Sequence, residues 1–170
     1  MNELDIIENT YTTRLNERGY RVLYGFNDDV AGMLHAGSKD PEITAHTRDG
    51  VRFATHKEAV AWYESSRKPR LVYSLASQAL SAVIWFSNAT TEYSTASNTF
   101  AIRMYADARG MGLAGDFLEA AHTDFENRVG GDVWLKVKSL NEGARRLYET
   151  HDYLINDETD GTVTMTRTIK

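Results

Sequence analysis

One stretch of the chain joins an apolar run, a glycine-rich turn and an amphipathic pattern: FAIRMYADARGMGLAGDFLEAAHTDFENR, residues 100–128. The run Phe100–Tyr105 predicts a strand. The residues after the turn predict a helix from about Gly112 to Arg128, which ends at Gly130-Gly131. One face of this helix carries apolar side chains at helical spacing: Leu113, Phe117, Ala121 and Phe125.

The turn between this strand and this helix has the chemistry of an anion site. The first N–H groups of a helix have no partner inside the helix, and the helix dipole adds partial positive charge there. Gly110 and Gly112 carry no side chain that would keep an anion away from this backbone. Such a site suits a phosphate or a pyrophosphate.

A dinucleotide fingerprint also matches the turn, as Gly110-x-Gly112-x-x-Gly115. That fingerprint needs an acidic residue about 20 residues later, at the end of the next strand. Asp132 instead precedes the strand predicted at Val133–Lys138, and the chain ends in a hairpin where a doubly wound sheet needs more parallel units. A Walker motif is excluded because no Gly-Lys-Ser/Thr follows. The match leaves a nicotinamide-dependent oxidoreductase open as an alternative.

The residues after this unit predict a second strand–helix unit and a terminal hairpin. Val133–Lys138 alternates as a strand does, and Glu142–Thr150 predicts a short helix. Tyr153–Asn156 and Thr162–Arg167 flank Asp160-Gly161, which is a hairpin signal.

The first hundred residues predict a mixture of helices and strands. The spacing from Leu4 to Leu15 predicts an additional N-terminal helix within residues 1–20, ended by Gly19. The later elements are a strand at Arg21–Phe26, a helix capped by Asn27, a helix from the capping box Thr55-x-x-Glu58 to about Ser66, a turn at Arg67–Arg70, and a hairpin of strands at Leu71–Ala76 and Leu80–Phe86. Gly37–Val51 is loop-like, and Asn88–Asn98 is a loop or a weak strand.

Two short motifs follow the two strands of the second half. They are Arg109-x-x-Gly112-x-Ala114 and Asn141-x-x-Ala144-x-x-x-Tyr148. In this order and placement they resemble the signature motifs of the GNAT superfamily of acyl-CoA-dependent N-acetyltransferases. The resemblance spans residues 21–170. It implies a single α+β domain over 1–170, with a mixed, twisted sheet that is splayed open in the middle and has helices on both faces.

The resemblance also implies where acetyl-CoA binds. The first motif would wrap the pyrophosphate, and the second would place Asn141 near the pantetheine and Tyr148 near the sulfur. A backbone N–H near Met104 would meet the developing oxyanion where the strand splays. The residues implied for the cofactor site are Ile102, Met104, Arg109, Gly110, Met111, Gly112, Leu113, Ala114, Asn141 and Tyr148.

Tyr148 is the predicted catalytic acid. A phenol with a pKa of about 10 is protonated at neutral pH and can donate to a leaving thiolate. The alternative for Tyr148 is a core aromatic, and Asn141 is equally suited to cap its helix. Because the chain has no cysteine, a thioester on the protein is excluded and direct transfer is expected.

The general base has no assigned residue. The strand Phe100–Tyr105 has no carboxylate, although some members of the family carry the base there. A water chain is one candidate, and Glu92 and His56 are the side chains to test first. The missing carboxylate also leaves open a protein that holds CoA without acetylating anything. Asp152 stands where the family usually has glycine, so a left-handed turn is expected there at some cost.

The composition excludes several classes of protein. The 170 residues are 42% hydrophobic and 25% charged, as in globular domains, and the absence of cysteine excludes disulfide scaffolds and thiolate zinc sites. The histidines have no metal-ligand spacing, so no metal is expected. Acidic residues exceed basic ones by 24 − 19 = 5, which disfavours nucleic-acid binding. The acidic start and the short longest apolar run, Ala82–Phe86, predict no signal peptide, no membrane span and a cytoplasmic protein.

The predicted function is transfer of an acetyl group from acetyl-CoA to a primary amine. The acceptor, a small molecule or a peptide, would be selected by Gly37–Val51 and Asn88–Asn98. The net charge of −5 tilts the expectation toward a cationic acceptor. Members of the family often pair, so a homodimer is left open.

Overall fold

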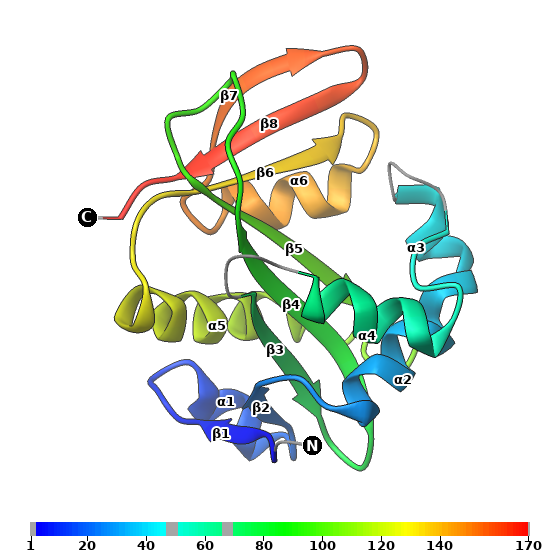
Figure 1. Cartoon of the computed structure of the whole chain (residues 1–170). Helices are drawn as coiled ribbons and strands as arrows, with labels where there is room; N and C mark the ends of the chain where they lie inside the picture. Colours follow the sequence, from blue (N-terminus) through cyan, green and yellow to red (C-terminus); the bar gives the residue numbers. More distant parts are fainter. Residues whose placement is uncertain (1–2, 47–50, 66–69, 170) are drawn as a thin grey trace.

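The computed structural model describes residues 3–46, 51–65 and 70–169. Within these ranges, eight strands form one sheet in the order β1-β2-β3-β4-β5-β6-β8-β7 (Figure 1). Neighbouring strands run antiparallel, except for the parallel pair β5 and β6. The strands are β1 (Asp5–Ile7), β2 (Arg21–Tyr24), β3 (Leu71–Ala76), β4 (Leu80–Asn88), β5 (Asn98–Met104), β6 (Val133–Lys138), β7 (Leu154–Thr159) and β8 (Thr162–Arg167).

Helices cover both faces of the sheet. The helical elements are α1 (Thr12–Glu17), α2 (Asp28–Ala36), the 3-10 turn η1 (Gly37–Lys39), α3 (Pro41–His46), α4 (His56–Glu64), α5 (Ala114–Arg128) and α6 (Glu142–Glu149). Helices α1, α5 and α6 share one hydrophobic core with the sheet, and α2 and α4 share a second one on the other face. The predicted mixed α+β fold with helices on both faces is confirmed.

The sheet opens between β5 and β6. Their pairing is confined to Asn98 with Val133 and Thr99 with Trp134. On its other side, β5 pairs with β4 along the whole of Asn98–Met104. Beyond Thr99 the two parallel strands diverge, which leaves a notch in the middle of the sheet. The predicted splay is therefore confirmed.

In the second half of the chain, helix ends and turns lie where short-range sequence signals predict them. Helix α5 ends before Gly130 and Gly131, which both have positive φ. Asp160 and Gly161 have φ of 51° and 73°, as in the tight turn of a hairpin between β7 and β8. Asp152 adopts the expected left-handed conformation, with φ of 64°.

The predicted N-terminal helix is wrong in its first half. Residues Asp5–Ile7 form an edge strand paired with β2, and only Thr12–Glu17 is helical. The reason lies at Asn9, whose Oδ1 accepts hydrogen bonds from the backbone N–H groups of Tyr11 and Thr12. This side-chain turn takes the place of a continuing helix.

The predicted loop at Gly37–Val51 is wrong for its described part, which contains η1 and α3. Pro41 is the first residue of α3, where its fixed φ suits a helix start, and the Asp40 carboxylate accepts a hydrogen bond from Glu42 N. A Cβ at Gly37 would lie 2.0 Å from the Tyr105 ring, so glycine is required for this approach to the end of β5.

The capping box of α4 is present in a shifted form. Glu58 N donates to Thr55 Oγ1 at 3.1 Å, and the Glu58 carboxylate accepts from Ala54 N rather than from Thr55 N. The predicted end of this helix at Ser66 and the turn residues Arg67–Pro69 lie outside the described residues.

Candidate active site

A cavity of about 900 Å³ occupies the notch between β5 and β6. Its walls come from both faces of the sheet. Leu113 at the start of α5 and Tyr148 on α6 belong to one core, whereas Trp85 on β4 belongs to the other. The cavity therefore passes through the sheet, from the glycine-rich turn on one face to α3 on the other.

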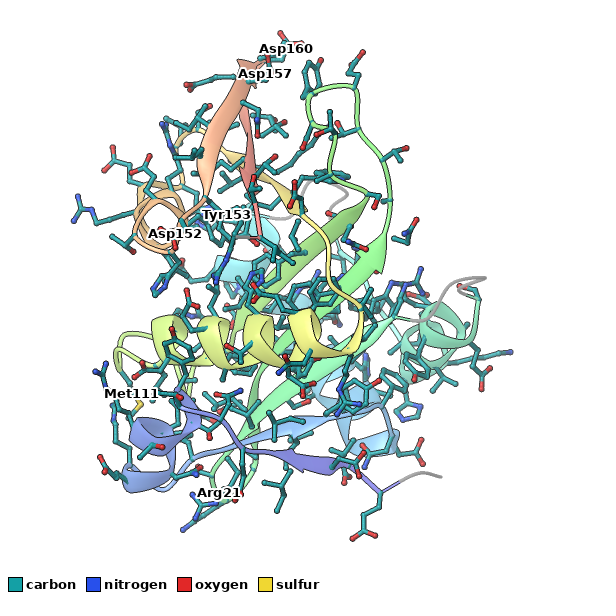
Figure 2. All side chains as sticks on the ribbon, turned by 90° about the vertical axis from the view of Figure 1, so that its left-hand side faces the viewer. Arg21, Met111, Asp152, Tyr153, Asp157 and Asp160 are labelled. Atoms are coloured by element: carbon teal, nitrogen blue, oxygen red, sulfur yellow. The ribbon has the colours of Figure 1, made fainter. Side chains whose placement is uncertain are left out.

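The predicted cofactor residues gather at this cavity, with one exception. The lining contains Ile102, Met104, Arg109, Gly110, Gly112, Leu113, Ala114, Asn141 and Tyr148. Met111 is absent from the lining, and its side chain is half-exposed beside the N-terminal helix (Figure 2). Its carbonyl accepts a 2.6 Å hydrogen bond from Arg18, and its sulfur lies 3.6 Å from the Tyr20 hydroxyl.

The glycine-rich turn is open toward the cavity. Gly110 and Gly112 have φ of 74° and 68°, which L side chains rarely adopt, and no atom lies within 4 Å of a Cβ built on either. Helix α5 begins after Leu113 without a side-chain cap, so its first N–H groups lack such a partner. These features leave space and backbone donors at the turn, and anion binding there remains a prediction.

Arg109 ties this turn to α3. Its Nε donates to the Met104 carbonyl at 3.2 Å, and its Nη1 and Nη2 pair with the Asp40 carboxylate. The hydrogen bond from Arg109 lowers the pKa of Asp40, so this carboxylate is ionised at neutral pH. Because Asp40 also accepts from Glu42 N at the start of α3, the glycine-rich turn and α3 are held together.

The backbone of β5 presents free donors to the notch. Tyr105 N donates to Ser81 O, and Ala89 N donates to Ser97 O, so the odd-numbered residues of β5 hydrogen-bond toward β4. N–H groups alternate in direction along a strand, and those of Ile102 and Met104 therefore face the notch. Strand β6 does not pair there, which leaves the N–H of Met104 available to a bound ligand.

Tyr148 lies in the wall of the cavity. Its ring is buried and packs edge-on against Phe100, with centroids 6.1 Å apart, and against Tyr153 at 5.7 Å. No described residue is hydrogen-bonded to its hydroxyl. Burial raises the pKa of Tyr148 above its usual value, so the phenol keeps its proton at neutral pH.

Asn141 caps α6, as its position in the sequence suggests. Its Oδ1 accepts a hydrogen bond from Ala144 N at 3.3 Å, and it also lines the cavity. The capping role is confirmed, while contact with a cofactor remains a prediction.

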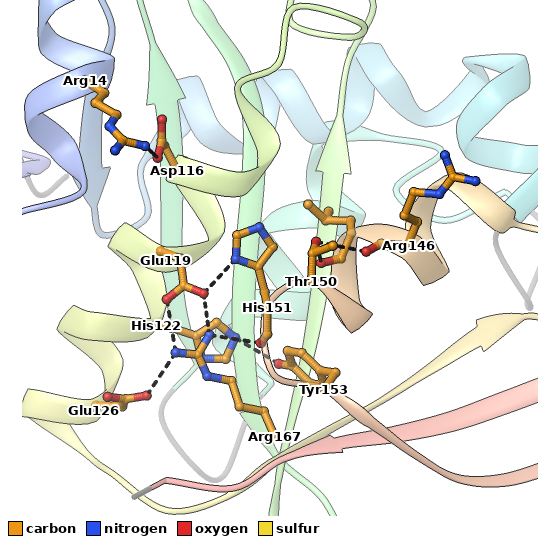
Figure 3. A network of polar contacts seen from close by, with 11 residues as sticks. Arg14, Asp116, Glu119, His122, Glu126, Arg146, Thr150, His151, Tyr153 and Arg167 are labelled. Atoms are coloured by element: carbon orange, nitrogen blue, oxygen red, sulfur yellow. Dashed lines mark hydrogen bonds and ion pairs between the residues drawn. The ribbon is translucent and has the colours of Figure 1, made fainter.

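A network of polar side chains fixes α6 against α5 and β8. Glu119 on α5 accepts hydrogen bonds from Arg167 Nη1 and Nη2, at 2.8 and 3.0 Å, and lies 2.8 Å from His151 Nδ1 (Figure 3). The hydroxyl of Tyr153 and Nε2 of the fully buried His122 are 2.8 Å apart. Burial lowers the pKa of His122 well below its usual value and keeps the ring neutral. The network thereby sets the position of the helix that carries Tyr148.

The two side chains suggested as general bases are outside the cavity. Glu92 is exposed on the loop after β4. His56 is the first residue of α4, and its Nε2 lies 3.4 Å from Oδ1 of Asp28 on α2. The described lining instead holds Glu42 and His46, one turn apart on α3, with 4.0 Å between Glu42 Oε2 and His46 Nε2.

The sequence contains a local signal for helix α3. Pro41 followed by Glu42 is a common helix start, and a glutamate and a histidine four residues apart lie on one helix face. Its place at the cavity depends on contacts with residues more than sixty positions away, such as the one between Asp40 and Arg109.

In the described ranges, no group of three or more His, Asp or Glu side chains could hold a metal ion. None of the helices that the structure describes is long and apolar enough to cross a membrane.

No protein-family model matches the chain, and no curated protein is similar to it in sequence. Solved structures are similar in fold. One is yncA from Salmonella typhimurium, given as an acetyltransferase with its cofactor acetyl-CoA, with a TM-score of 0.71 and 13% identity over 89% of this chain and 95% of that one.

Two more structures are similar over 87% of this chain and 99% of their own chains. They are the ribosomal-protein-alanine N-acetyltransferase from Brucella melitensis, with a TM-score of 0.71 and 12% identity, and an acetyltransferase of the GNAT family from Streptococcus pneumoniae, with a TM-score of 0.66 and 17% identity. The chain thus has the fold of the GNAT acetyltransferases.

The sheet topology does not fit the dinucleotide-binding fold that the Gly110–Gly115 fingerprint needs. Only β5 and β6 are parallel among the described strands, so the sheet is not doubly wound. Asp132 lies before β6, and its carboxylate accepts a hydrogen bond from Ile169 N. Neither feature suits a nicotinamide-binding site.

Proposed function

We propose that the protein is an N-acetyltransferase that transfers an acetyl group from acetyl-CoA directly to a primary amine. One observation carries this proposal: a single cavity joins the glycine-rich anion site, the free N–H of Met104, the Tyr148 hydroxyl and α3. An acyl donor and an acceptor could therefore enter from opposite faces of the sheet and meet at the notch.

The residues at the notch fit acetyl-CoA. Gly110 and Gly112 leave room for a phosphate at the open start of α5, and the apolar side chains of Ile102 and Met104 suit the pantetheine arm. Asn141 lies on the same wall and offers an amide to it. Because acetyl-CoA is available in the cytoplasm, we place the reaction there.

The chemistry needs few protein groups. Acetyl-CoA supplies an acetyl group activated as a thioester. The Met104 N–H donates to the carbonyl oxygen as negative charge develops on it. The neutral amine forms the new N–C bond while the C–S bond breaks, the amine proton passes to a base, and CoA leaves as a thiolate. Tyr148 donates a hydrogen bond to that sulfur; its raised pKa favours this role over complete proton transfer.

Glu42 and His46 are the candidates for the base, directly or through water. They are the carboxylate and the imidazole among the described lining residues, and both keep contact with solvent. We expect His46→Gln to lower kcat about 10-fold to 100-fold without changing the Kd for acetyl-CoA. His56→Gln is the matched control and should leave kcat unchanged, because His56 lies outside the cavity. Equal activities of both variants would remove His46 from the mechanism.

A second candidate is a protein that binds CoA without catalysis. It is favoured by one observation: the part of β5 at the notch has no carboxylate. Titration calorimetry with acetyl-CoA, followed by an assay of thiol release over a panel of amines, tests both. Saturable binding with thiol release supports the enzyme, and binding without release from any amine supports the second candidate. No binding of acetyl-CoA would contradict both.

A further inference from the structure

An arginine that forms no ion pair with any described residue lies in the wall of the cavity opposite the glycine-rich turn. Arg103 on β5 is only 7% exposed and lines the cavity. Its buried Nη1 has no hydrogen-bond partner of normal geometry. Its polar neighbour is the buried Tyr105 hydroxyl, which partly offsets the effect of burial on the pKa of Arg103. Because β5 pairs Arg103 with Val83, its side chain lies on the face covered by α2 and α4.

Two more arginines lie beside it. Arg52 also lines the cavity, and Arg70 has a buried Nη1 that lacks a hydrogen-bond partner. Burial and then the positive charge of Arg52 lower the pKa of Arg70. Burial also lowers the pKa of Arg103; the Tyr105 hydroxyl opposes this effect and Arg52 adds to it. None of the three forms an ion pair with an acidic residue in the described parts of the chain.

Aromatic rings hold these guanidinium groups in place. The Arg103 guanidinium carbon lies 5.1 Å from the centre of the Phe53 ring and 5.4 Å from that of Trp85, while Arg52 lies 5.2 Å from Phe53. Phe53 has φ of 60°, a conformation that is strained for a bulky residue and that is common at functional sites. The rings favour cations but offer no acceptor for the N–H groups.

A buried guanidinium without an acceptor is costly, and an oxyanion that pairs with it recovers this cost. The cavity offers space for one next to Arg103 and Arg52. We propose that this wall binds an oxyanion of the acceptor, so that the preferred acceptor is a primary amine that also carries a carboxylate, as amino acids do. This inference rests on the proposed function. The net charge of −5 favours a cationic acceptor, but the positive charge of Arg103 and Arg52 at the site outweighs the net charge of the whole chain.

The test compares acceptors that differ only in this group. The probes are free amino acids, the corresponding amino acid amides, the corresponding decarboxylated amines and aminophosphonates. Binding is followed through tryptophan fluorescence, since Trp85 lies beside Arg103, and acetylation is followed by thiol release. We expect the acids to bind and react roughly 100-fold better than the amides and amines. A preference for aminophosphonates over the amino acids would assign the site to phosphoryl groups and would overturn the proposal that it binds a carboxylate.

Variants locate the effect. Arg103→Gln should remove the preference for acids over amides and leave the Kd for acetyl-CoA unchanged. Arg52→Gln, at a less buried position, is the second variant and should reduce the same preference. Arg21→Gln is the matched control, because Arg21 is exposed on β2 far from the cavity (Figure 2). Acids and amides that bind equally to the unaltered protein would overturn the inference, and a preference that survives Arg52→Gln and Arg103→Gln would do so as well.

The two proposals fail in different ways. If amino acids bind preferentially through Arg103 but no amine is acetylated, the carboxylate site at Arg103 stands and the transferase proposal fails. If amines are acetylated with no preference for amino acids, the transferase proposal stands and the carboxylate site at Arg103 fails.

Discussion

At the scale of single residues, Tyr148 is a buried phenol in the wall of the cavity, and no hydrogen bond joins its hydroxyl to another described residue. Tyr148→Phe should keep the ring packing on Phe100 and remove only the donor. We expect kcat to fall by roughly 100-fold and the Kd for acetyl-CoA to change less than 3-fold. Steady-state kinetics and calorimetry measure the two quantities. An unchanged kcat would mean that Tyr148 serves only the core.

The pKa of Tyr148 also predicts the pH dependence of the rate. Burial raises this pKa above the usual value of about 10, so the phenol stays protonated throughout the range from about pH 6 to pH 9.5. At saturating substrates, kcat should rise with pH as the amine or the base loses its proton, and it should not fall again below about pH 9.5. A falling limb in that range that disappears in Tyr148→Phe would contradict the assignment.

Gly112 gives a residue-scale test of the anion site. It has positive φ and open space at the position of a Cβ. Gly112→Glu adds bulk and negative charge there and should abolish acetyl-CoA binding in calorimetry. Gly112→Ala is the control, because it carries the same backbone strain, about 1 kcal/mol, without the charge. Both variants should unfold at similar urea concentrations, and retained binding by Gly112→Glu would rule out the phosphate assignment.

At the scale of elements, the contacts of Glu119 join α5 to β8 and to the turn after α6. Glu119→Gln should destabilise the protein by about 2 kcal/mol, because Arg167 loses its closest charged partner at a largely buried position and keeps only the longer 3.7 Å contact with Glu126. Arg14→Gln is the control. It breaks the pair with Asp116 (Figure 3), in which the Arg14 side chain is 78% exposed, and should cost less than about 0.5 kcal/mol. Urea unfolding measures both, and equal losses would contradict the role of the network.

Helix α3 shows how an element acquires its role from its neighbours. By itself it is a six-residue helix without buried residues, which has little stability in water. Its place comes from Asp40, which caps it and pairs with Arg109, and from the approach of Gly37 to Tyr105. These contacts bring Glu42 and His46 to the cavity.

At the scale of the whole molecule, topology decides between two readings of the same glycines. Gly110, Gly112 and Gly115 satisfy the dinucleotide fingerprint, but a nicotinamide site also needs further parallel strands beside this one. The sheet has only one parallel pair among its described strands. Calorimetry should therefore detect saturable binding of acetyl-CoA and none of NADH or NADPH, and equal binding of NADH would contradict the assignment of this turn.

Much of the fold could be predicted from the sequence because its signals are local. Asn27 caps α2, Asp160-Gly161 closes the last hairpin, and the amphipathic spacing of α5 buries one face. Each depends on interactions within a few residues, so the local sequence is sufficient. The residues before Thr12 do not form the predicted helix, because the turn at Asn9 and pairing with β2 outweigh a helical spacing of apolar residues.

Local sequence signals are sufficient for the strand–turn–helix unit at residues 100–128, for the open glycine-rich turn within it and for the order of elements that defines the fold class. The residues that face this turn across the cavity are set by tertiary packing. The Arg109–Asp40 pair joins residues 69 positions apart, and Arg103 meets Phe53 and Trp85 from separate elements. The reason is physical: whether a buried charge has a partner depends on which distant segments pack around it, and no local pattern specifies that packing.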